Sequence, residues 1–407
     1  MSPRKSVPLK FSVKAVCSST RARVGLLSLK QPNEDRFVDI ETPIFMPVGT
    51  NGTMKGILPS QIEATGCRLM LSNTYHLASR PGADILQKAG GLHAFMNWPY
   101  ALLTDSGGFQ MVSLSSLMEV KEEGVTFTSP YDKEKLLFLP PEKAVEIQHK
   151  IGANIIMQLD DVISSTADDD QRFEEATDRT IRWYDRCREA HESQEDEQNL
   201  FPIIQGGLNP RLREKCVAEI VKRDPPGIAI GGLSGGEEKD KFVEMVACST
   251  KHLPAEKPRY LMGVGFAVDM LLCVALGCDM FDCVFPTRTA RFGSALVEYG
   301  KSMSLKQAKF ADDFNIIEDE CDCETCKNGY LRSYIHHLFR NNSTVACHLL
   351  TQHNIRFQLR FMAKIRDAIR NNKFEQFIKK TLENHYESEH LYPSWVQNAI
   401  RILQIKL

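Results

Sequence analysis

A short apolar run recurs eight times between residues 43 and 285, and this repeat constrains the fold more than any other feature of the chain. Each run carries a Gly, Asp, Asn or Gln at or near its end, and a longer amphipathic segment follows most of the runs. Continuous apolar runs are typical of parallel strands buried on both faces. Eight β/α units over roughly 250 residues predict an α/β fold, a (β/α)8 TIM barrel; a doubly wound open sheet is the alternative that periodicity leaves open. The runs are Pro43–Gly49, Arg68–Thr74, Ala101–Ser106, Asn154–Asp160, Phe201–Gly207, Gly227–Gly232, Tyr260–Gly265 and Met280–Phe285.

Two strands are expected before the repeat. Lys10–Val16 alternates polar and apolar residues, and Val24–Leu29 follows after a turn. The pair is predicted to close one end of the barrel. No acid precedes Glu34, which resembles a transit peptide weakly, but the alternation favours a strand.

Two further segments interrupt or follow the repeat. The gap from Ser106 to Asn154 is predicted to be an inserted hairpin or loop over the barrel mouth. Within the acid-rich residues 161–200, Asp168–Asp170 and Glu192–Glu197 are predicted to be solvated loop or helix ends without a site role. The apolar window Leu261–Phe281 contains Asp269 and Asp279 and is predicted to be a buried strand and helix, with no membrane span.

A carboxylate followed by arginines forms the first candidate site. Asp282 lies within the last apolar run, which stops at Pro286, and Arg288 and Arg291 follow within nine residues of it. An acid at the end of a barrel strand is typical of a catalytic group, and arginines suit a phosphodiester backbone. The net charge of −2 excludes a generally basic nucleic-acid binder, so RNA contacts must be local. The alternative is a turn-capping Asp282 with solvated arginines.

Polar groups end four other runs. Asp105, followed by Gly107 and Gly108, would supply the second carboxylate that glycosidic chemistry requires; a turn former is the alternative. Asp160, Gln205 and the peptide groups of residues 231–236 can hydrogen-bond the edge of a purine, although each could instead cap a helix.

Three closely spaced cysteines indicate a metal site. Cys321, Cys323 and Cys326 precede four histidines, His336, His337, His348 and His353, and one of these would complete a closed Cys3His zinc site of structural type. Spacing alone does not choose the histidine, and chance clustering among twelve cysteines is the alternative. Without a secretory h-region, the cysteines are expected to be mostly free thiols in a reducing compartment.

A helical pattern lies near the C-terminus. Phe357, Phe361, Ile365, Ala368 and Ile369 recur at helical spacing and predict a buried stripe. The same segment carries several arginines and a lysine, and two interpretations remain open for them, a solvated basic face or an RNA-facing surface. These cations are Arg356, Arg360, Lys364, Arg366 and Arg370.

Several long stretches together resemble the tRNA-guanine transglycosylase family, most closely its eukaryotic catalytic branch. The resemblance covers nearly the whole chain. Its most specific parts are Phe45–Thr50, Ser72–Leu77, Thr104–Gln110, Gly231–Glu237 and Gly277–Arg291. It implies exchange of guanine-34, the wobble base of GUN-anticodon tRNAs (for aspartate, asparagine, histidine and tyrosine), for queuine. It also implies a (β/α)8 TIM barrel with a C-terminal zinc-binding subdomain.

The resemblance also implies residue roles. Asp282 would be the nucleophile that forms a covalent ribosyl-aspartate, and Asp105 the proton acceptor and acid/base. The structural Zn2+ would be bound by Cys321, Cys323, Cys326 and His353. Substrate would contact Asp105, Ser106, Gly107, Gly108, Phe109, Asp160, Gln205, Gly232, Leu233, Gly235, Met262 and Gly263. RNA would contact Gly263, Val264, Gly265, Phe266, Ala267, Val268, Asp269, Thr287, Arg288, Thr289, Ala290 and Arg291.

One position distinguishes the branches of the family. Bacterial members usually carry valine where this chain has Gly235. The smaller residue leaves room for the cyclopentenediol of queuine, so the resemblance implies queuine rather than its aminomethyl precursor.

The family also suggests partners and domains. The expected partner is a homologous non-catalytic accessory subunit in a heterodimer, with a cytoplasmic location and peripheral association with the mitochondrial outer membrane. The expected domains are N-terminal capping strands (1–42), the catalytic barrel (43–300), and a zinc subdomain with C-terminal helices that completes the barrel and dimer surface (301–407).

Two rival functions remain. A non-enzymatic RNA-binding subunit predicts loss of one or both aspartates, and a sugar-cleaving barrel hydrolase needs neither the arginines nor the zinc loop.

Overall fold

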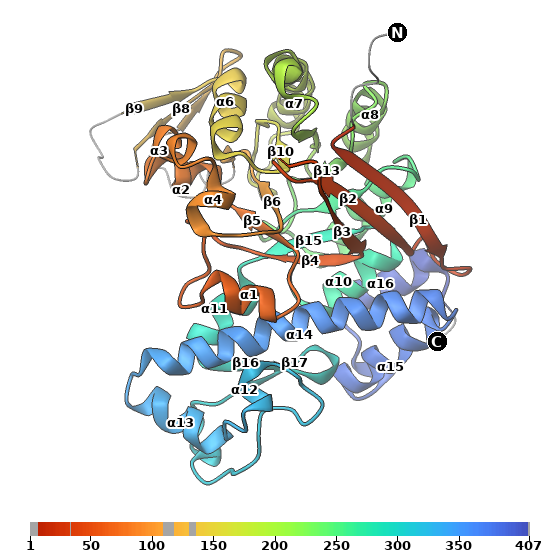
Figure 1. Ribbon diagram of the computed structural model, residues 1–407. Coiled ribbons are helices and arrows are strands. Elements are labelled where there is room, and N and C mark those ends of the chain that lie inside the picture. The colour runs from red at the N-terminus through yellow and green to blue at the C-terminus, as the bar shows by residue number, and fades with distance from the viewer. Residues whose placement is uncertain (1–6, 33, 109–117, 130–135, 406–407) are drawn as a thin grey trace.

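Eight parallel strand positions form a closed barrel in a computed structural model that describes residues 7–32, 34–108, 118–129 and 136–405 (Figure 1). Two sheets, β5-β6-β10-β11 and β12-β13-β14-β15-β4, make up the barrel. The bridge between Val48 and Leu71 joins β4 to β5, and Pro202 separates β11 from β12. Because β15 also pairs with β4, the sheet is closed, and the open-sheet alternative was wrong. The strands are β4 (Ile44–Pro47), β5 (Leu69–Ser72), β6 (Ala101–Thr104), β10 (Ile155–Met157), β11 (Asn199–Phe201) with β12 (Ile203–Ile204), β13 (Ile228–Ile230), β14 (Arg259–Leu261) and β15 (Met280–Cys283).

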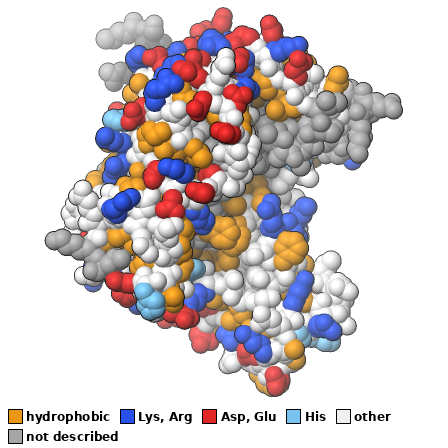
Figure 2. All heavy atoms as spheres, turned by 180° about the vertical axis from the view of Figure 1, so that it is seen from behind, with side chains coloured by type: hydrophobic (Ala, Val, Ile, Leu, Met, Phe, Trp, Pro, Cys, Tyr) orange, Lys and Arg blue, Asp and Glu red, His pale blue; other side chains and the backbone are white. Residues whose placement is uncertain are grey.

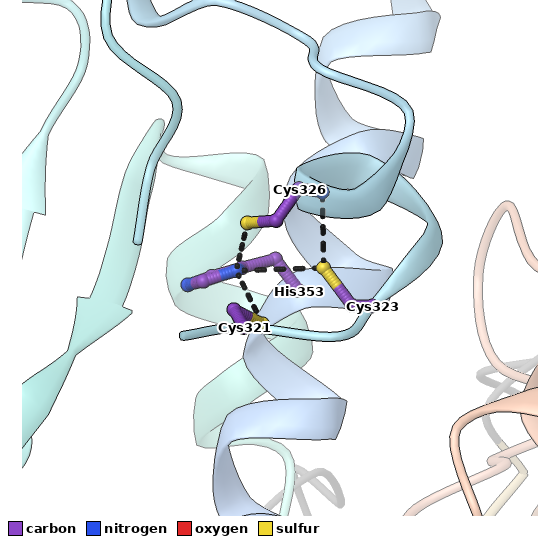
Figure 3. A group of neighbouring side chains, drawn as sticks. All are labelled: Cys321, Cys323, Cys326 and His353. Atoms are coloured by element: carbon purple, nitrogen blue, oxygen red, sulfur yellow. Dashed lines mark hydrogen bonds between the residues drawn. The ribbon is translucent and has the colours of Figure 1, made fainter. Parts of the chain in front are cut away.

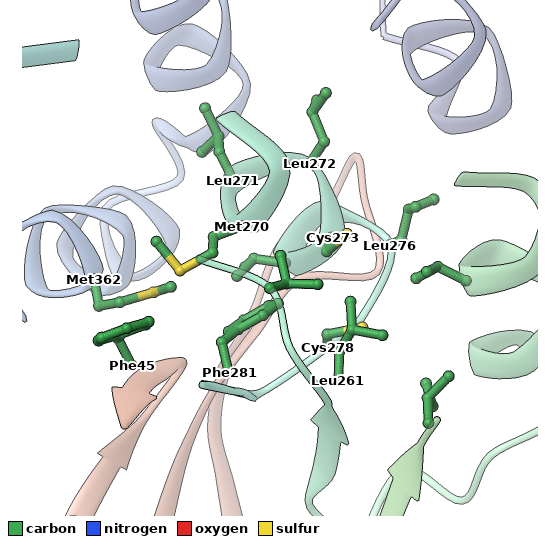
Figure 4. Packing of buried hydrophobic residues seen from close by; sticks show 14 of the residues in the cluster. Phe45, Leu261, Met270, Leu271, Leu272, Cys273, Leu276, Cys278, Phe281 and Met362 are labelled. Carbon is green, nitrogen blue, oxygen red and sulfur yellow. The ribbon is translucent and has the colours of Figure 1, made fainter. Parts of the chain in front are cut away.

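Helices follow the strands, as the repeat predicts. Asp169 caps α7 by accepting a hydrogen bond from the Arg172 amide, which confirms that this acidic stretch is a helix end. α10 packs Met270 toward Phe45, Phe281 and Met362, between the barrel wall and the C-terminal helices (Figure 4). The helices are α1 (Pro59–Ala64), α2 (Thr74–Ser79), α3 (Ala83–Lys88), α4 (Leu92–Met96), α6 (Pro141–Ile151), α7 (Asp170–His191), α8 (Pro210–Val221), α9 (Lys239–Lys251), α10 (Ala267–Ala275) and α11 (Phe285–Arg291).

An antiparallel N-terminal sheet covers the amino ends of the barrel strands. It consists of β1 (Leu9–Val16), β2 (Arg23–Lys30) and β3 (Phe37–Thr42). Its apolar side chains form one core cluster with the inward-facing barrel residues. Arg23 pairs with the buried Asp279, which directly precedes β15. The predicted closing pair is therefore confirmed, and β3 extends it.

The insertion after β6 contains a small antiparallel sheet of β7 (Met118–Val120), β8 (Val125–Thr128) and β9 (Leu136–Leu139). Phe127 packs on Tyr75, and the Trp183 indole donates to the Glu122 carbonyl oxygen at 2.8 Å. The predicted hairpin thus has one strand more than expected and lies against α2 and α7.

The C-terminal part is organised around α14 (Thr344–Arg370), which crosses beneath the barrel in Figure 1. The predicted stripe is confirmed, because Phe357, Phe361 and Ile365 are buried. The other elements of this part are β16 (Ser294–Val297), β17 (Lys301–Ser304), α12 (Glu324–Lys327), α13 (Arg332–Arg340), α15 (Phe374–Tyr386), α16 (Ser394–Leu403) and the 3-10 turns η2 (Glu298–Gly300), η3 (Ala308–Phe310) and η4 (Glu389–Leu391). A further 3-10 turn, η1 (Glu192–Gln194), follows α7 in the barrel.

The structure shows what the arginines of α14 contact, which the sequence left open between a solvated basic face and an RNA-facing surface. Arg356 pairs with Asp322 at 2.6 Å and Arg360 with Glu318 at 3.0 Å. Arg366 donates to the Pro43 carbonyl oxygen at 2.8 Å. Arg356, Arg360 and Arg366 therefore tie α14 to neighbouring segments. Lys364 and Arg370 are exposed, as a solvated basic face predicts, and Arg370 also pairs with Glu41. Within the described ranges, no helix is both long and apolar enough to cross a membrane.

Candidate functional site

The strand ends that carry the predicted polar residues converge at the carboxyl end of the barrel. Seen from behind, the molecule is hollowed between the barrel and the C-terminal part, and hydrophobic, Lys and Arg side chains gather beside the hollow (Figure 2). This end is opposite the N-terminal sheet. It is where a parallel barrel presents its reactive side chains.

Asp282 is held through one of its two oxygens. Its Oδ1 accepts hydrogen bonds from the Tyr260 hydroxyl at 2.6 Å and the Gly263 amide at 2.8 Å. Among the described residues, none donates to Oδ2. The atoms packed around the carboxylate raise the pKa of Asp282 by desolvation, and the two donors partly oppose this.

Asp105 is held at both oxygens from the end of β5. The Thr74 amide donates to Oδ1 at 2.8 Å, and the Asn73 side-chain amide donates to Oδ2. Both aspartates act on Tyr260. Burial raises the pKa of Tyr260 well above its usual value, and the charge of Asp282 and, to a smaller extent, that of Asp105 raise it further. The fold thus brings both predicted carboxylates to the same region.

A third carboxylate lies with the predicted base-binding groups. Asp160 accepts from the Ser106 hydroxyl at 3.1 Å and from the Gln205 side-chain amide at 2.7 Å. Burial raises the pKa of Asp160 to about 6, against these hydrogen bonds. These groups form a connected hydrogen-bonding surface of the kind that can bind the edge of a flat, polar base.

Two glycines keep this surface open. A Cβ at Gly232, which has φ +67°, would lie 2.1 Å from the Gln205 Oε1. A Cβ at Gly108 would lie 3.1 Å from the Asp160 Oδ1. Leu233 and Met262 are partly buried at the neighbouring strand ends. The predicted contact Phe109 lies outside the described residues.

The turn after β13 contains Gly235. Glu237 accepts from the Ser234 amide at 2.5 Å, from the Gly235 amide at 2.9 Å and from the Ser165 hydroxyl at 2.7 Å. A Cβ at Gly235 would lie 2.7 Å from the Ser165 Oγ. A larger residue at 235 would therefore displace Ser165.

The two predicted RNA-contacting segments flank Asp282. Gly265 packs closely against Cys283, because a Cβ added at position 265 would lie 2.4 Å from the Cys283 Cβ. Phe266 is half exposed and packs on Phe285 with ring centroids 4.2 Å apart. Arg288 is exposed, whereas Ala267, Val268, Asp269, Thr287 and Ala290 are buried and cannot present their side chains to a ligand without movement.

Cys321, Cys323, Cys326 and His353 form a buried group that could hold a metal ion (Figure 3). The three Sγ atoms lie 3.6, 3.6 and 3.4 Å from the His353 Nδ1. A tetrahedral zinc ion with Zn–S of about 2.3 Å and Zn–N of about 2.0 Å places such atoms about 3.5 Å apart. The four residues therefore fit zinc.

The remaining nitrogen of His353 fixes its orientation. Nε2 donates to the Leu296 carbonyl oxygen at 2.7 Å, which leaves Nδ1 to face the cysteines. His348 instead lies beside Gly56 and Gln352, and His336 beside Leu305. The choice of His353 for this metal-binding group is confirmed.

Sequence reasoning missed Tyr260, Asn73 and Thr74 as partners of the two aspartates, and Ser165 and Glu237 in the Gly235 turn. Tyr260 carried a usable signal, because a tyrosine within a fully buried strand requires a hydrogen-bond partner. The others carried none, since their roles depend on which strand ends become neighbours.

Comparison with known proteins gives a consistent result. Residues 17–387 match the family described as Queuine tRNA-ribosyltransferase. A Queuine tRNA-ribosyltransferase catalytic subunit from Caenorhabditis elegans is 52% identical, over 90% of this chain and 94% of that protein. One from Schizosaccharomyces pombe is 50% identical over 98% of both chains. A Queuine tRNA-ribosyltransferase from Thermoanaerobacter sp. is 46% identical, over 94% of this chain and 99% of that protein.

Proposed function

Because the chain belongs to the queuine tRNA-ribosyltransferase family, we propose that it is a tRNA-guanine transglycosylase that replaces guanine-34 of GUN-anticodon tRNAs by queuine. The main structural support is the pair Asp282 and Asp105 beside a hydrogen-bonding surface for a base. A purely RNA-binding subunit would not need this arrangement.

Asp282 is proposed as the nucleophile. Its Oδ1 is occupied by Tyr260 and Gly263, so Oδ2 attacks C1′ of the ribose. The C1′–N9 bond breaks, and guanine leaves with the electron pair and receives a proton from Asp105. A ribosyl-aspartate ester remains, as in a retaining glycosidase.

The second displacement regenerates the carboxylate. Queuine loses its N9 proton to Asp105 and attacks C1′, and the ester bond breaks. Asp105 gives one proton to guanine and takes one from queuine, so it ends the cycle in the protonation state in which it began. Two inversions retain the configuration at C1′. No ATP is required, because one N-glycosidic bond replaces another.

The base is proposed to lie on the surface formed by Asp160, Gln205 and the backbone of Gly232 and Leu233. Ser106, Gly107, Gly108, Met262 and Gly263 would line this subsite, and Gly235 would leave room for the cyclopentenediol. The anticodon loop would follow residues 263–269 and 287–291, where Phe266 and Arg288 offer exposed side chains.

Zinc is proposed at Cys321, Cys323, Cys326 and His353. Bound there, it would supply a structural cross-link between the cysteine loop and α14. A site closed by four protein ligands has no open position for substrate. The domain division is proposed at residues 1–42, 43–300 and 301–407.

A homologous accessory subunit is proposed as the partner in a heterodimer, in the cytoplasm and peripherally on the mitochondrial outer membrane. The names of the eukaryotic relatives as catalytic subunits support a second subunit. Light scattering after size-exclusion chromatography, with and without the partner, tests the heterodimer; a chain that remains monomeric when mixed with the partner would refute it.

Base exchange into a GUN-anticodon tRNA, followed with labelled guanine, tests the proposed reaction. Wild type, Asp282→Asn and Asp105→Asn are compared with and without the partner, and each sample is also run on a denaturing gel. Wild type should exchange guanine and show a covalent protein–RNA band, and Asp282→Asn should lose both. A covalent band in Asp282→Asn would place the nucleophile elsewhere, with Asp105 as the next candidate.

A further inference from the structure

Arg213 is a fully buried cation close to the proposed base subsite. It lies on α8, and its side chain is 0% exposed. Nε donates to the Gly207 carbonyl oxygen at 2.8 Å, and one terminal nitrogen donates to the Gly231 carbonyl oxygen at 3.0 Å. The other terminal nitrogen lies 3.4 Å from the Ser249 hydroxyl on α9. The guanidinium therefore links the backbone after β12 to the backbone after β13.

These two carbonyl groups belong to the segments that present the base-binding groups. Gly207 is two residues after Gln205, and Gly231 directly precedes Gly232. Gly207 and Gly232 have φ of +55° and +67°, in the left-handed region that favours glycine. Glycine backbone is intrinsically free, so an external anchor is needed to hold these segments in one geometry.

Burying this cation is costly. Desolvation lowers the pKa of Arg213 to about 10, so the group remains charged near neutral pH. Within the described part of the chain, it makes no ion pair, and its side chain bonds only to neutral oxygens. An apolar side chain could fill the space without the desolvation cost. What it could not supply is several donors in a fixed planar fork.

We propose that Arg213 is a positioning residue for the nucleobase: by fixing the Gly207 and Gly231 carbonyl groups, it sets the spacing between the Gln205 side-chain amide and the Gly232 backbone. Gln205 and Gly232 are already at van der Waals contact, so a small shift of either segment changes the surface that the base meets. This inference rests on the proposed function and adds a residue that does not itself touch the substrate.

Arg259 provides a matched control at the opposite end of the barrel. It is also buried, its pKa is also lowered to about 10 chiefly by burial, and it also donates to backbone carbonyl groups. These belong to Leu253, Pro254 and Gly277, near the amino ends of β14 and β15. Replacing Arg259 therefore removes similar contacts from the fold without touching the base-binding end.

The test compares Arg213→Met, Arg213→Lys and Arg259→Met in guanine exchange. KM for guanine and KM for tRNA are measured separately, at a temperature below the Tm of every variant. Arg213→Met should raise KM for guanine at least tenfold and change KM for tRNA less than twofold. Arg213→Lys should lie between Arg213→Met and wild type. Arg259→Met should lower the Tm while KM for guanine stays within twofold. Arg213→Lys carries the test alone if Arg213→Met does not fold.

An unchanged KM for guanine in the folded Arg213 variants, whatever their Tm, would overturn the inference. So would an equal increase in Arg259→Met, because the effect would then be general destabilisation. Calorimetric titration with guanine in the absence of tRNA separates this result from failure of the proposed function. If wild type neither exchanges nor binds guanine, the proposed function fails; if wild type does both and the Arg213 variants match it, only the inference fails.

Discussion

At the scale of single residues, the two aspartates differ in how many of their oxygens are held. Asp105 accepts hydrogen bonds on both oxygens, whereas the two donors to Asp282 converge on Oδ1. A carboxylate anchored through one oxygen keeps a fixed orientation while the other oxygen forms and breaks a bond. The partners, more than the residue type, distinguish the two proposed roles.

Tyr260→Phe tests this distinction. In the proposed second displacement Asp282 is the leaving group, and a hydrogen bond to it would stabilise the charge that returns to the carboxylate. Loss of a hydrogen bond to a charged group costs about 1.5–3 kcal/mol, so exchange should slow about tenfold or more. The covalent band should persist, because the ester still forms. Tyr392→Phe is the control, since the buried Tyr392 hydroxyl has no hydrogen-bond partner within the described ranges. Normal exchange in Tyr260→Phe would refute the role.

The raised pKa of Asp160, about 6, predicts a pH dependence of base binding. If the ionised carboxylate binds the base, KM for guanine should rise about tenfold between pH 7 and pH 5, because the ionised fraction falls by about that factor. Asp160→Asn should bind guanine poorly and lose this dependence. A flat profile in wild type would contradict the role of Asp160.

The same shift has a consequence for stability. The folded pKa lies above the unfolded value, so the folded protein binds more protons between the two pKa values. This contribution to stability is fully present below pH 4 or so and is lost as the pH rises through about 6. Thermal unfolding of wild type and Asp160→Asn between pH 5 and pH 7 should show that only wild type loses this contribution.

At the scale of elements, the proposed role of Gly235 in substrate choice depends on the backbone geometry of the turn after β13. Ser234 adopts φ +62° without being glycine, and Glu237 holds it there through two backbone amides and Ser165. Such a conformation costs about 1–3 kcal/mol and persists only where its surroundings enforce it. The space beside Gly235 is therefore set by the whole turn.

Gly235→Val should weaken queuine binding more than guanine binding. Its Cβ would lie 2.7 Å from the Ser165 Oγ, so Ser165 must move and the added methyl groups narrow the space beside the base. Competition between queuine and guanine for exchange measures the effect. Ser165→Ala alone is the control, and the double variant Gly235→Val/Ser165→Ala tests whether removing the Ser165 hydroxyl relieves the clash. Equal loss for both bases would rule out this account of selectivity.

Much of the order of helices and strands could be predicted, because it is encoded in short stretches of sequence. Each barrel strand is a continuous apolar run, and the pattern is visible without knowing its neighbours. β3 was missed, although its buried Val38 and Ile40 alternate with exposed Asp39 and Glu41. The ion pairs of Arg356 and Arg370 on α14 could not be predicted, because their acidic partners lie far away in sequence. The strand-end positions of Asp105, Asp160, Gln205 and Asp282 followed from the repeat, whereas the partner of the Tyr260 hydroxyl and the role of Arg213 depend on the register of neighbouring strands.

At the scale of the whole molecule, α14 connects the metal-binding group to the proposed catalytic end. His353 lies in the metal-binding group, Asn354 donates to the Pro286 carbonyl oxygen at 3.1 Å, and Gln358 donates to the Gly265 carbonyl oxygen at 2.6 Å. One helix thus supports both segments that flank Asp282.

Removal of the metal should therefore affect stability and activity together. Cys326→Ser, or treatment with a strong chelator, should lower the Tm by about 5 °C or more, because structural zinc contributes directly to folding free energy. Exchange activity should fall in parallel with zinc content measured by mass spectrometry. Cys347→Ser, on α14 but outside the metal-binding group, should leave the Tm within about 1 °C. An unchanged Tm in zinc-free protein would contradict a structural role.

The N-terminal sheet has a consequence for the order of events. Since β1, β2 and β3 pack over the amino ends of the strands, the described part of the chain leaves the opposite mouth of the barrel as the route by which a base would reach Asp282 in the proposed reaction. In the proposed reaction, guanine would leave before queuine enters, and the two bases would then compete for the same ribosyl-enzyme. The fraction of tRNA converted at any moment would therefore depend on the supply of the two free bases, and abundant guanine would delay conversion even when the enzyme is plentiful.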